Sequence, residues 1–160
     1  MNSNPWFIAT AGAAGAAVAI AGMEALSASA GFPLMAIPFA TSIVLVLGSP
    51  QVEPAQPRAL IGGHLVSTAV GLAVVALLGP GPWAAAIAVG LAMLAMNVTG
   101  TFHPPAGIDP LVVAVHGMPW SFLLVPVAAG AVLLALFAFA WHNLFRRRAG
   151  AGPAWPARWW

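Results

Sequence analysis

The stretch TGTFHPPAGIDP, residues 99–110, decides how the rest of the chain is interpreted. It ends a long apolar segment with glycine and small hydroxyl residues and then runs into two consecutive prolines. Proline lacks a backbone N–H and holds φ at about −65°, so it interrupts one helix and suits the first turn of the next. The apolar run that follows, residues 111–115, is too short to cross a bilayer.

A second break with the same pattern lies earlier, in GSPQVEPAQPR, residues 48–58. Here too an apolar segment stops at small residues, the chain passes through prolines, and Pro57 stands where a new helix can begin. Each break therefore offers a helix N-terminus, whose free N–H groups and positive dipole favour an anion.

Composition places the chain in lipid. Hydrophobic residues make up 61% of it and charged residues only 5%, and the mean hydropathy is +0.95, whereas a soluble domain carries about 25% charged residues. Within a bilayer every backbone polar group needs an internal partner, and the apolar runs show no in-out alternation. We predict an all-α, polytopic transmembrane helix bundle with a broken or re-entrant helix at the His-Pro-Pro motif.

Five apolar segments are expected. The first is interpreted as a retained span and not as a signal peptide, because residues 1–5 contain no Lys or Arg. Two crossings separate the two breaks, so the breaks are predicted to lie on one face and to converge, as the discontinuous helices of many transporters do. The segments are residues 6–26, 32–48, 59–78, 83–99 and 120–141.

The few charges indicate orientation and no nucleic-acid partner. Five arginines against three acids give a formal charge of +2, and the consecutive arginines 146–148 follow an apolar segment, as at the cytoplasmic end of a span. We expect a multi-pass protein of a bacterial inner membrane, with a cytoplasmic C-terminus and, for five crossings, an N-terminus outside. Residues 1–148 are predicted to form one transmembrane domain and residues 149–160 an interfacial tail in contact with the lipid bilayer.

Arg58, one residue past Pro57, is a candidate anion ligand because its planar guanidinium offers a fork of donors. The alternative is a surface arginine paired with Glu53. His64 lies in an otherwise apolar segment with Ser67 three residues on, so both can face the bundle interior. Their alternative is a structural role, through hydrogen bonds to nearby carbonyl groups.

His103 is held extended by the prolines after it, and it can donate to an anion or shuttle a proton. The alternative is a rigid fastening of the loop. Asn97, Thr99 and Thr101 can donate to the same anion or cap helix ends. Asp109 is a second candidate for proton coupling.

No two histidines stand at i, i+3 or i, i+4 and cysteine is absent, so no metal site, cofactor or catalytic residue is predicted.

Residues 99–107, together with Pro57-Arg58 and Gly63-His64, resemble the signature of the HPP family of integral membrane proteins, over roughly residues 30–141. That family is usually described as having four membrane helices, and some members are associated with nitrite transport. The resemblance implies a nitrite or similar anion permease. It also implies a structural motif formed by Pro57, Gly63, Pro104, Pro105 and Gly107.

One position departs from the family pattern. After His-Pro-Pro-Ala-Gly the family commonly continues with alanine and a small polar residue, whereas this chain has Ile108-Asp109-Pro110. A carboxylate beside an anion route repels the substrate unless it is protonated, paired or turned away.

The function expected is transport or channelling of a small inorganic anion, with nitrite as the first candidate and a homo-oligomer as a possible assembly. Two other classes stay open. One is an intramembrane enzyme or metal-binding protein that uses the histidines. The other is a structural membrane subunit, which would use the small-residue face of the first segment, including Gly15 and Gly22.

Overall fold

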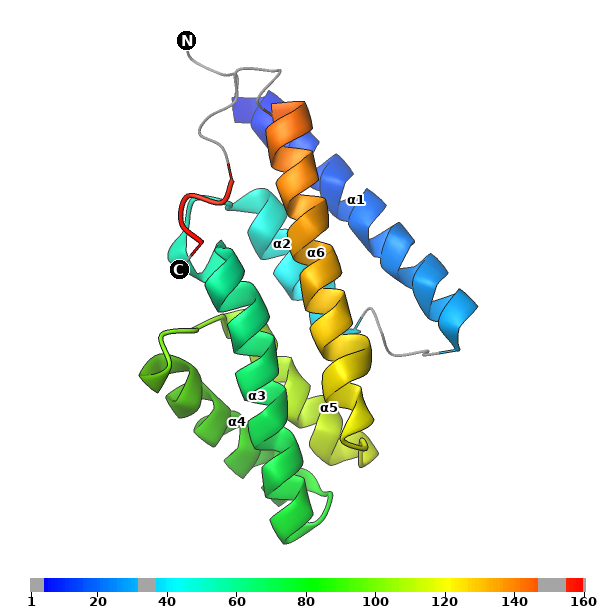
Figure 1. The fold of residues 1–160 in the computed structure, drawn as a ribbon, viewed down its shortest axis with the longest axis vertical. Coiled ribbons are helices and arrows are strands. Elements are labelled where there is room, and N and C mark those ends of the chain that lie inside the picture. The colour runs from blue at the N-terminus through cyan, green and yellow to red at the C-terminus, as the bar shows by residue number, and fades with distance from the viewer. Residues whose placement is uncertain (1–4, 32–36, 147–154, 160) are drawn as a thin grey trace.

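The computed structural model describes residues 5–31, 37–146 and 155–159, and every regular element among them is helical (Figure 1). The longer helices are α1 (Pro5–Ala30), α2 (Ala40–Gly48), α3 (Pro57–Leu78), α4 (Pro82–Val98), α5 (Ile108–His116) and α6 (Ala129–Ala140). Short helical turns join or extend them: η1 (Ile37–Phe39), η2 (Glu53–Ala55), η3 (Pro104–Gly107), η4 (Leu123–Ala128) and η5 (Trp141–Arg146).

Three helices of the described chain are long and apolar enough to cross a membrane: Pro5–Ser29, Pro57–Leu78 and Leu123–Leu144. At about 1.5 Å per residue each exceeds a hydrocarbon core of about 30 Å. The predicted segments 32–48 and 83–99 correspond to the shorter apolar helices Ile37–Gly48 and Pro82–Val98. Residues 32–36 lie outside the described part.

The run at residues 111–115 is part of a nine-residue helix, α5, which packs against α3 and α4. Five crossings would put the start of α1 and the end of α6 at opposite ends of the bundle, but Figure 1 shows them at the same end. Trp141 agrees with the figure, because its Nε1 donates to the Ala11 carbonyl at 3.2 Å. The predicted combination of an outside N-terminus and a cytoplasmic C-terminus is therefore wrong for this arrangement.

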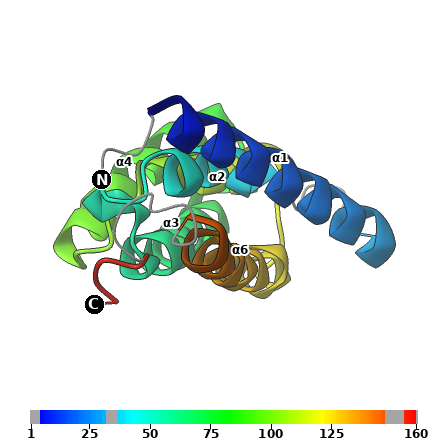
Figure 2. The same ribbon diagram turned by 90° about the horizontal axis from the view of Figure 1, so that it is seen from above.

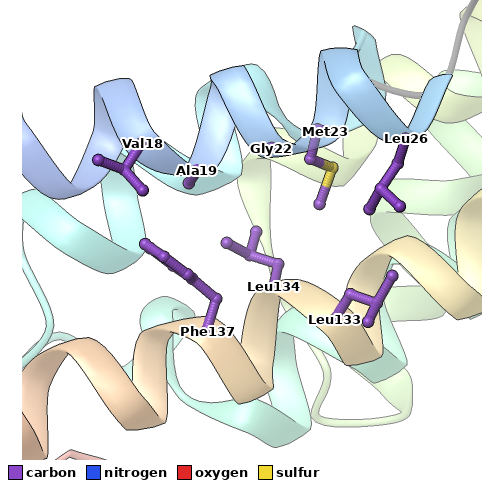
Figure 3. Close-up of a pocket in the computed structure, with 8 residues that line it drawn as sticks. All are labelled: Val18, Ala19, Gly22, Met23, Leu26, Leu133, Leu134 and Phe137. Atoms are coloured by element: carbon purple, nitrogen blue, oxygen red, sulfur yellow. The ribbon is translucent and has the colours of Figure 1, made fainter. Parts of the chain in front are cut away.

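Helix α1 lies along the outer edge of the bundle, across α2 (Figure 2). Its small residues serve two different purposes. A Cβ atom at Gly15 would lie 2.6 Å from Nε1 of Trp141, so Gly15 provides room for the indole ring. Gly22 has open space where its Cβ would stand, and it lines an apolar groove of about 270 Å³ between α1 and α6. Figure 3 shows Val18 and Met23 facing Leu134 and Phe137 across this groove.

Residues 155–159, the described part of the predicted C-terminal tail, pack against η2 and the start of α3. Trp155 is buried, and its Nε1 donates to the Ala55 carbonyl at 3.2 Å. The amide of Ala157 donates to Oε1 of Gln56 at 2.9 Å. Arg158 forms an exposed ion pair with Glu53 at 3.2 Å. The end of the chain thus lies beside the first break.

Substitution of Gly15 by alanine is expected to destabilise the protein. Overpacking costs about 1–3 kcal/mol, which exceeds the roughly 1 kcal/mol by which alanine favours a helix over glycine. The midpoint of thermal unfolding in detergent should therefore fall for Gly15→Ala. Gly22→Ala, on the same helix but in open space, is the matched control and should melt no lower than the wild type. Equal stability of the two variants would show that Trp141 does not pack on Gly15.

Candidate functional site

The two proline breaks are in direct contact. Nδ1 of His103 donates to the Pro54 carbonyl at 2.6 Å, and Nη2 of Arg58 donates to the Thr99 carbonyl at 2.9 Å. Both bonds join the segment before or at the start of α3 to the segment that follows α4. The prediction that the breaks converge is confirmed.

A glycine on α3 makes this approach possible. A Cβ atom at Gly63 would lie 2.6 Å from Cβ of His103 and 2.8 Å from the Thr101 carbonyl oxygen. About two turns further along α3, a Cβ at Gly71 would lie 2.7 Å from Cα of Pro110. Helix α3 therefore presents a smooth face on which the 99–103 loop and α5 lie at backbone distance.

At the centre of these contacts lies a polar cluster made of Ser42, His64, Thr68, His103 and Asp109, all with 0% of their surface exposed. Oγ of Ser42 lies 2.8 Å from Nε2 of His64 and 2.9 Å from Nε2 of His103. Nδ1 of His64 lies 2.8 Å from Oδ2 of Asp109. The hydroxyl of Thr68 donates to that same carboxyl oxygen at 3.0 Å.

Four separate segments supply the cluster. His64 and Thr68 stand four residues apart on α3 and so share a helix face. Ser42 comes from α2, His103 from the loop before η3, and Asp109 from the first turn of α5. A carboxylate in the first turn of a helix is favoured by the helix dipole. Within the described chain, Oδ1 of Asp109 is a buried side-chain oxygen without a hydrogen-bond partner.

The predicted anion ligands fall into two groups in space. His64 and His103 are in the buried cluster, with ring centroids 5.2 Å apart. Arg58 is exposed and bonds to the Thr99 carbonyl, whereas the predicted alternative partner, Glu53, pairs with Arg158 instead.

The remaining predicted ligands bond to backbone carbonyls or to one another. The hydroxyl of Ser67 donates to the Ala106 carbonyl at 2.7 Å, and Nδ2 of Asn97 donates to the Met93 carbonyl of its own helix at 2.8 Å. The hydroxyl groups of Thr99 and Thr101 lie 2.7 Å apart. These bonds fit the structural alternatives that the sequence left open, and a role in binding stays a prediction.

Asp109, the departure from the family pattern, is paired with His64 inside the cluster. The carboxyl group is therefore buried and paired, which is one of the conditions under which it does not repel an anion. Ser42 was missed by the sequence reasoning, because one serine in an apolar segment is ordinary and its two histidine partners lie 22 and 61 residues away. The described residues contain no group of three or more His, Asp or Glu side chains arranged to hold a metal ion.

Two cavities lie near the proline breaks. The larger, of about 600 Å³, is mainly apolar and is lined by Thr41, Pro54, Pro104, Pro105 and Ile108 among others. Several of these are chain neighbours of cluster residues. The smaller, of about 190 Å³, contains the charged side chains of Glu53, Arg58 and Arg158 together with Gly100. Two arginines against one glutamate give this smaller cavity a net charge of +1.

The chain matches the family described as HPP, transmembrane region, over residues 1–150. Two transmembrane proteins of Dictyostelium discoideum are similar to it: one is 36% identical over 130 residues, and the other is 37% identical over 131 residues. Each match covers 76% of this chain.

This chain spans less than half the length of both relatives, 40% of one and 44% of the other. No solved structure matches it. The family match, the relatives and the apolar helices together show a transmembrane protein.

Gly63→Ala is expected to lower the free energy of unfolding by about 1–3 kcal/mol. The added methyl group meets a backbone carbonyl, which cannot rotate away as a flexible side chain can. The control is Gly90→Ala on α4, where nothing lies within 4 Å of the new atom. Unfolding of both variants in detergent, followed by circular dichroism, measures the difference. A Gly63→Ala protein as stable as the Gly90→Ala protein would contradict the close packing of α3 on the 99–103 loop.

Proposed function

Because the chain belongs to the HPP transmembrane family, we propose that it is a transporter or channel for a small inorganic anion, with nitrite as the first candidate. The proposal is supported most by the smaller cavity, where Arg58 meets the 99–103 loop. There a guanidinium, a net positive charge and the N-terminus of a 22-residue helix lie together.

The guanidinium of Arg58 retains donors for a ligand. Within the described chain its one hydrogen bond goes from Nη2 to the Thr99 carbonyl, which positions the group and leaves the other N–H groups available. Gly100 permits this approach, because it has φ of +64° and its Cβ would lie 3.0 Å from Nη2 of Arg58. A planar fork of donors suits the two oxygens of a small oxyanion.

Charge and helix dipole favour entry and also allow release. The first N–H groups of α3 have no partner within the helix, so its N-terminus carries partial positive charge towards the cavity. A net side-chain charge of +1 attracts a monovalent anion without trapping it, and conduction requires such moderate binding.

Orientation follows from the arginines near the C-terminus. The run at residues 146–148 favours a cytoplasmic end. Since the start of α1 and the end of α6 lie at one end of the bundle (Figure 1), we infer that both lie on that side. The Arg58 cavity contains Arg158, which comes from the same end of the chain as these arginines. We assign it to the cytoplasmic face of a bacterial inner membrane.

The short helices complete the proposed path. Helices α2 and α5 have nine residues each, about half of a membrane crossing. We interpret α4, η3 and α5 as a broken, re-entrant segment whose turn is the His-Pro-Pro motif. Non-helical backbone at membrane depth is tolerated where protein or a cavity surrounds it.

A second candidate function, hydrolysis, comes from the geometry of the cluster. Ser42, His64 and Asp109 are hydrogen bonded in the order of a serine hydrolase triad, at 2.8 Å in both bonds. However, the serine hydroxyl is fully buried and also bonded to a second histidine. A nucleophile needs access to its substrate, so we favour transport.

Reaction with a fluorophosphonate probe distinguishes these two functions. We expect no covalent labelling of the detergent-purified protein, because the side chain of Ser42 is closed to solvent. Labelling is read by mass spectrometry, with Ser42→Ala as the matched blank. Modification of the wild type at Ser42 would instead establish a reactive serine and favour the hydrolase.

Anion flux into proteoliposomes tests the transport proposal. The wild type should carry nitrite faster than empty liposomes, and nitrate, formate and chloride define its selectivity. Arg58→Lys keeps the charge but loses the fork, so flux should fall by roughly tenfold. Arg158→Lys, which keeps the charge that pairs with Glu53, is the matched control and should retain most of the flux. Absence of flux for all four anions, or equal loss in both variants, contradicts the assignment.

A further inference from the structure

We propose that the buried cluster of Ser42, His64, His103 and Asp109 is a proton relay that moves one proton between Asp109 and His103. The relay rests on the proposed transport function and deepens it, because it would couple anion movement to the proton gradient. Its support is a continuous line of short hydrogen bonds that crosses from α5 through α3 and α2 to the 99–103 loop.

The end of the line at His103 has a defined direction. A carbonyl oxygen only accepts, so Nδ1 of His103 carries a hydrogen and donates to Pro54. The hydroxyl of Ser42 has one hydrogen and two histidine neighbours. It can donate to only one of them, and the other must donate to it. One of the two Nε2 atoms therefore carries a hydrogen while the other accepts one.

Three arrangements satisfy every bond with the same number of hydrogens: an ion pair of Asp109 with His64, and the two between which the relay moves a proton. In the first of these two, the carboxyl group of Asp109 donates to Nδ1 of His64, Nε2–H of His64 donates to Ser42, and Ser42 donates to Nε2 of His103. In the second, Asp109 is a carboxylate that accepts from His64, Ser42 donates to His64, and His103 is an imidazolium that donates to Ser42.

Conversion between them is a chain of three transfers. The carboxyl proton passes to Nδ1 of His64, the Nε2 proton of His64 passes to Ser42, and the hydroxyl proton of Ser42 passes to Nε2 of His103. Each O–H or N–H bond that breaks is replaced by one that forms, and no electron is gained or lost. The net result is a proton moved from Asp109 to His103, while the three hydrogen bonds of the line are kept with their directions reversed.

An anion biases this equilibrium. Separated charges are costly in a low-dielectric interior, so the first arrangement, which has no net charges, is the resting one. The unpartnered Oδ1 of Asp109 agrees with it, because a neutral carboxyl tolerates an unpaired oxygen better than a carboxylate does. An anion held near the 99–103 loop attracts positive charge and favours the imidazolium of His103, while the dipole of α5 and the hydroxyl of Thr68 stabilise the carboxylate.

The surroundings isolate the relay from other charges. The cluster contains three titratable side chains, His64, His103 and Asp109. The described hydrogen bonds join no further titratable side chain of α2, α3, α5, η2 or the 99–103 loop to them. Glu53 is exposed and paired with Arg158. The ring of Phe39 covers His64, with centroids 4.7 Å apart.

The larger cavity gives the relay a route for proton exchange. Its lining residues Thr41, Pro104 and Ile108 are the chain neighbours of Ser42, His103 and Asp109. Its lining also includes the hydroxyl groups of Thr41 and Ser49, which can bind water. Small movements of the intervening backbone would bring that water to either end of the line.

Simultaneous measurement of anion uptake and external pH tests the relay. With an inward nitrite gradient and the membrane potential held by potassium and valinomycin, the wild type should make the external medium alkaline. Ser42→Ala should reduce this proton movement by roughly 100-fold, a common cost of removing a positioned proton-transfer group, while anion uptake continues. Ser27→Ala, a buried serine on α1 outside the cluster, should change neither quantity.

Other results of these measurements also decide between the proposals. Wild-type anion uptake without protons overturns the relay and leaves the transport function standing. Proportional loss of both fluxes in folded Ser42→Ala protein also overturns it, because a structural role predicts that outcome. If no anion is carried, the proposed transport function is contradicted. The relay is then tested separately by infrared spectroscopy of the carboxyl group of Asp109. A protonated carboxyl band that disappears in Asp109→Asn and shifts in Ser42→Ala supports it, and absence of that band in the wild type overturns it.

Discussion

The rest of the structure depends on the contact between the 99–103 loop and the start of α3. His103 bonds to the Pro54 carbonyl and Arg58 bonds to the Thr99 carbonyl, so each proline break satisfies a backbone acceptor of the other. Prolines leave few N–H groups with which carbonyls at a break can pair, and an unpaired carbonyl in an apolar interior is costly. Side chains from the opposite break fill that need.

This contact explains why chemistry gathers where regular structure fails. The glycine at position 63 lets the loop reach α3, and the loop then brings His103 to Ser42 and His64. Helix α5 begins directly after the motif and so presents Asp109 to the same point. A bundle that must pair its interrupted backbone thus also assembles a buried polar network, in which Oδ1 of Asp109 is a buried side-chain oxygen left without a partner among the described residues.

Most of the fold was accessible from composition and apolar runs, because the bilayer allows few solutions. The three long helices lie within a few residues of the predicted segments 6–26, 59–78 and 120–141. Convergence of the breaks followed from counting crossings between them. The predicted number of membrane crossings for the whole chain was misleading, since it took no account of the run at residues 111–115. That run is part of helix α5, which packs against α3 and α4. Intrinsic propensity of so short a segment would not suffice.

The sequence by itself determined that this is a helical membrane protein with two proline breaks in contact, and it identified His64, His103 and Asp109 as polar residues in need of partners. Only the tertiary structure decided what those partners are. It separated Arg58, at the surface, from the buried histidines, and it placed Ser42 between them. Hydropathy reports how each residue interacts with lipid or water, whereas hydrogen bonds between distant segments depend on how helices pack, which no local pattern encodes.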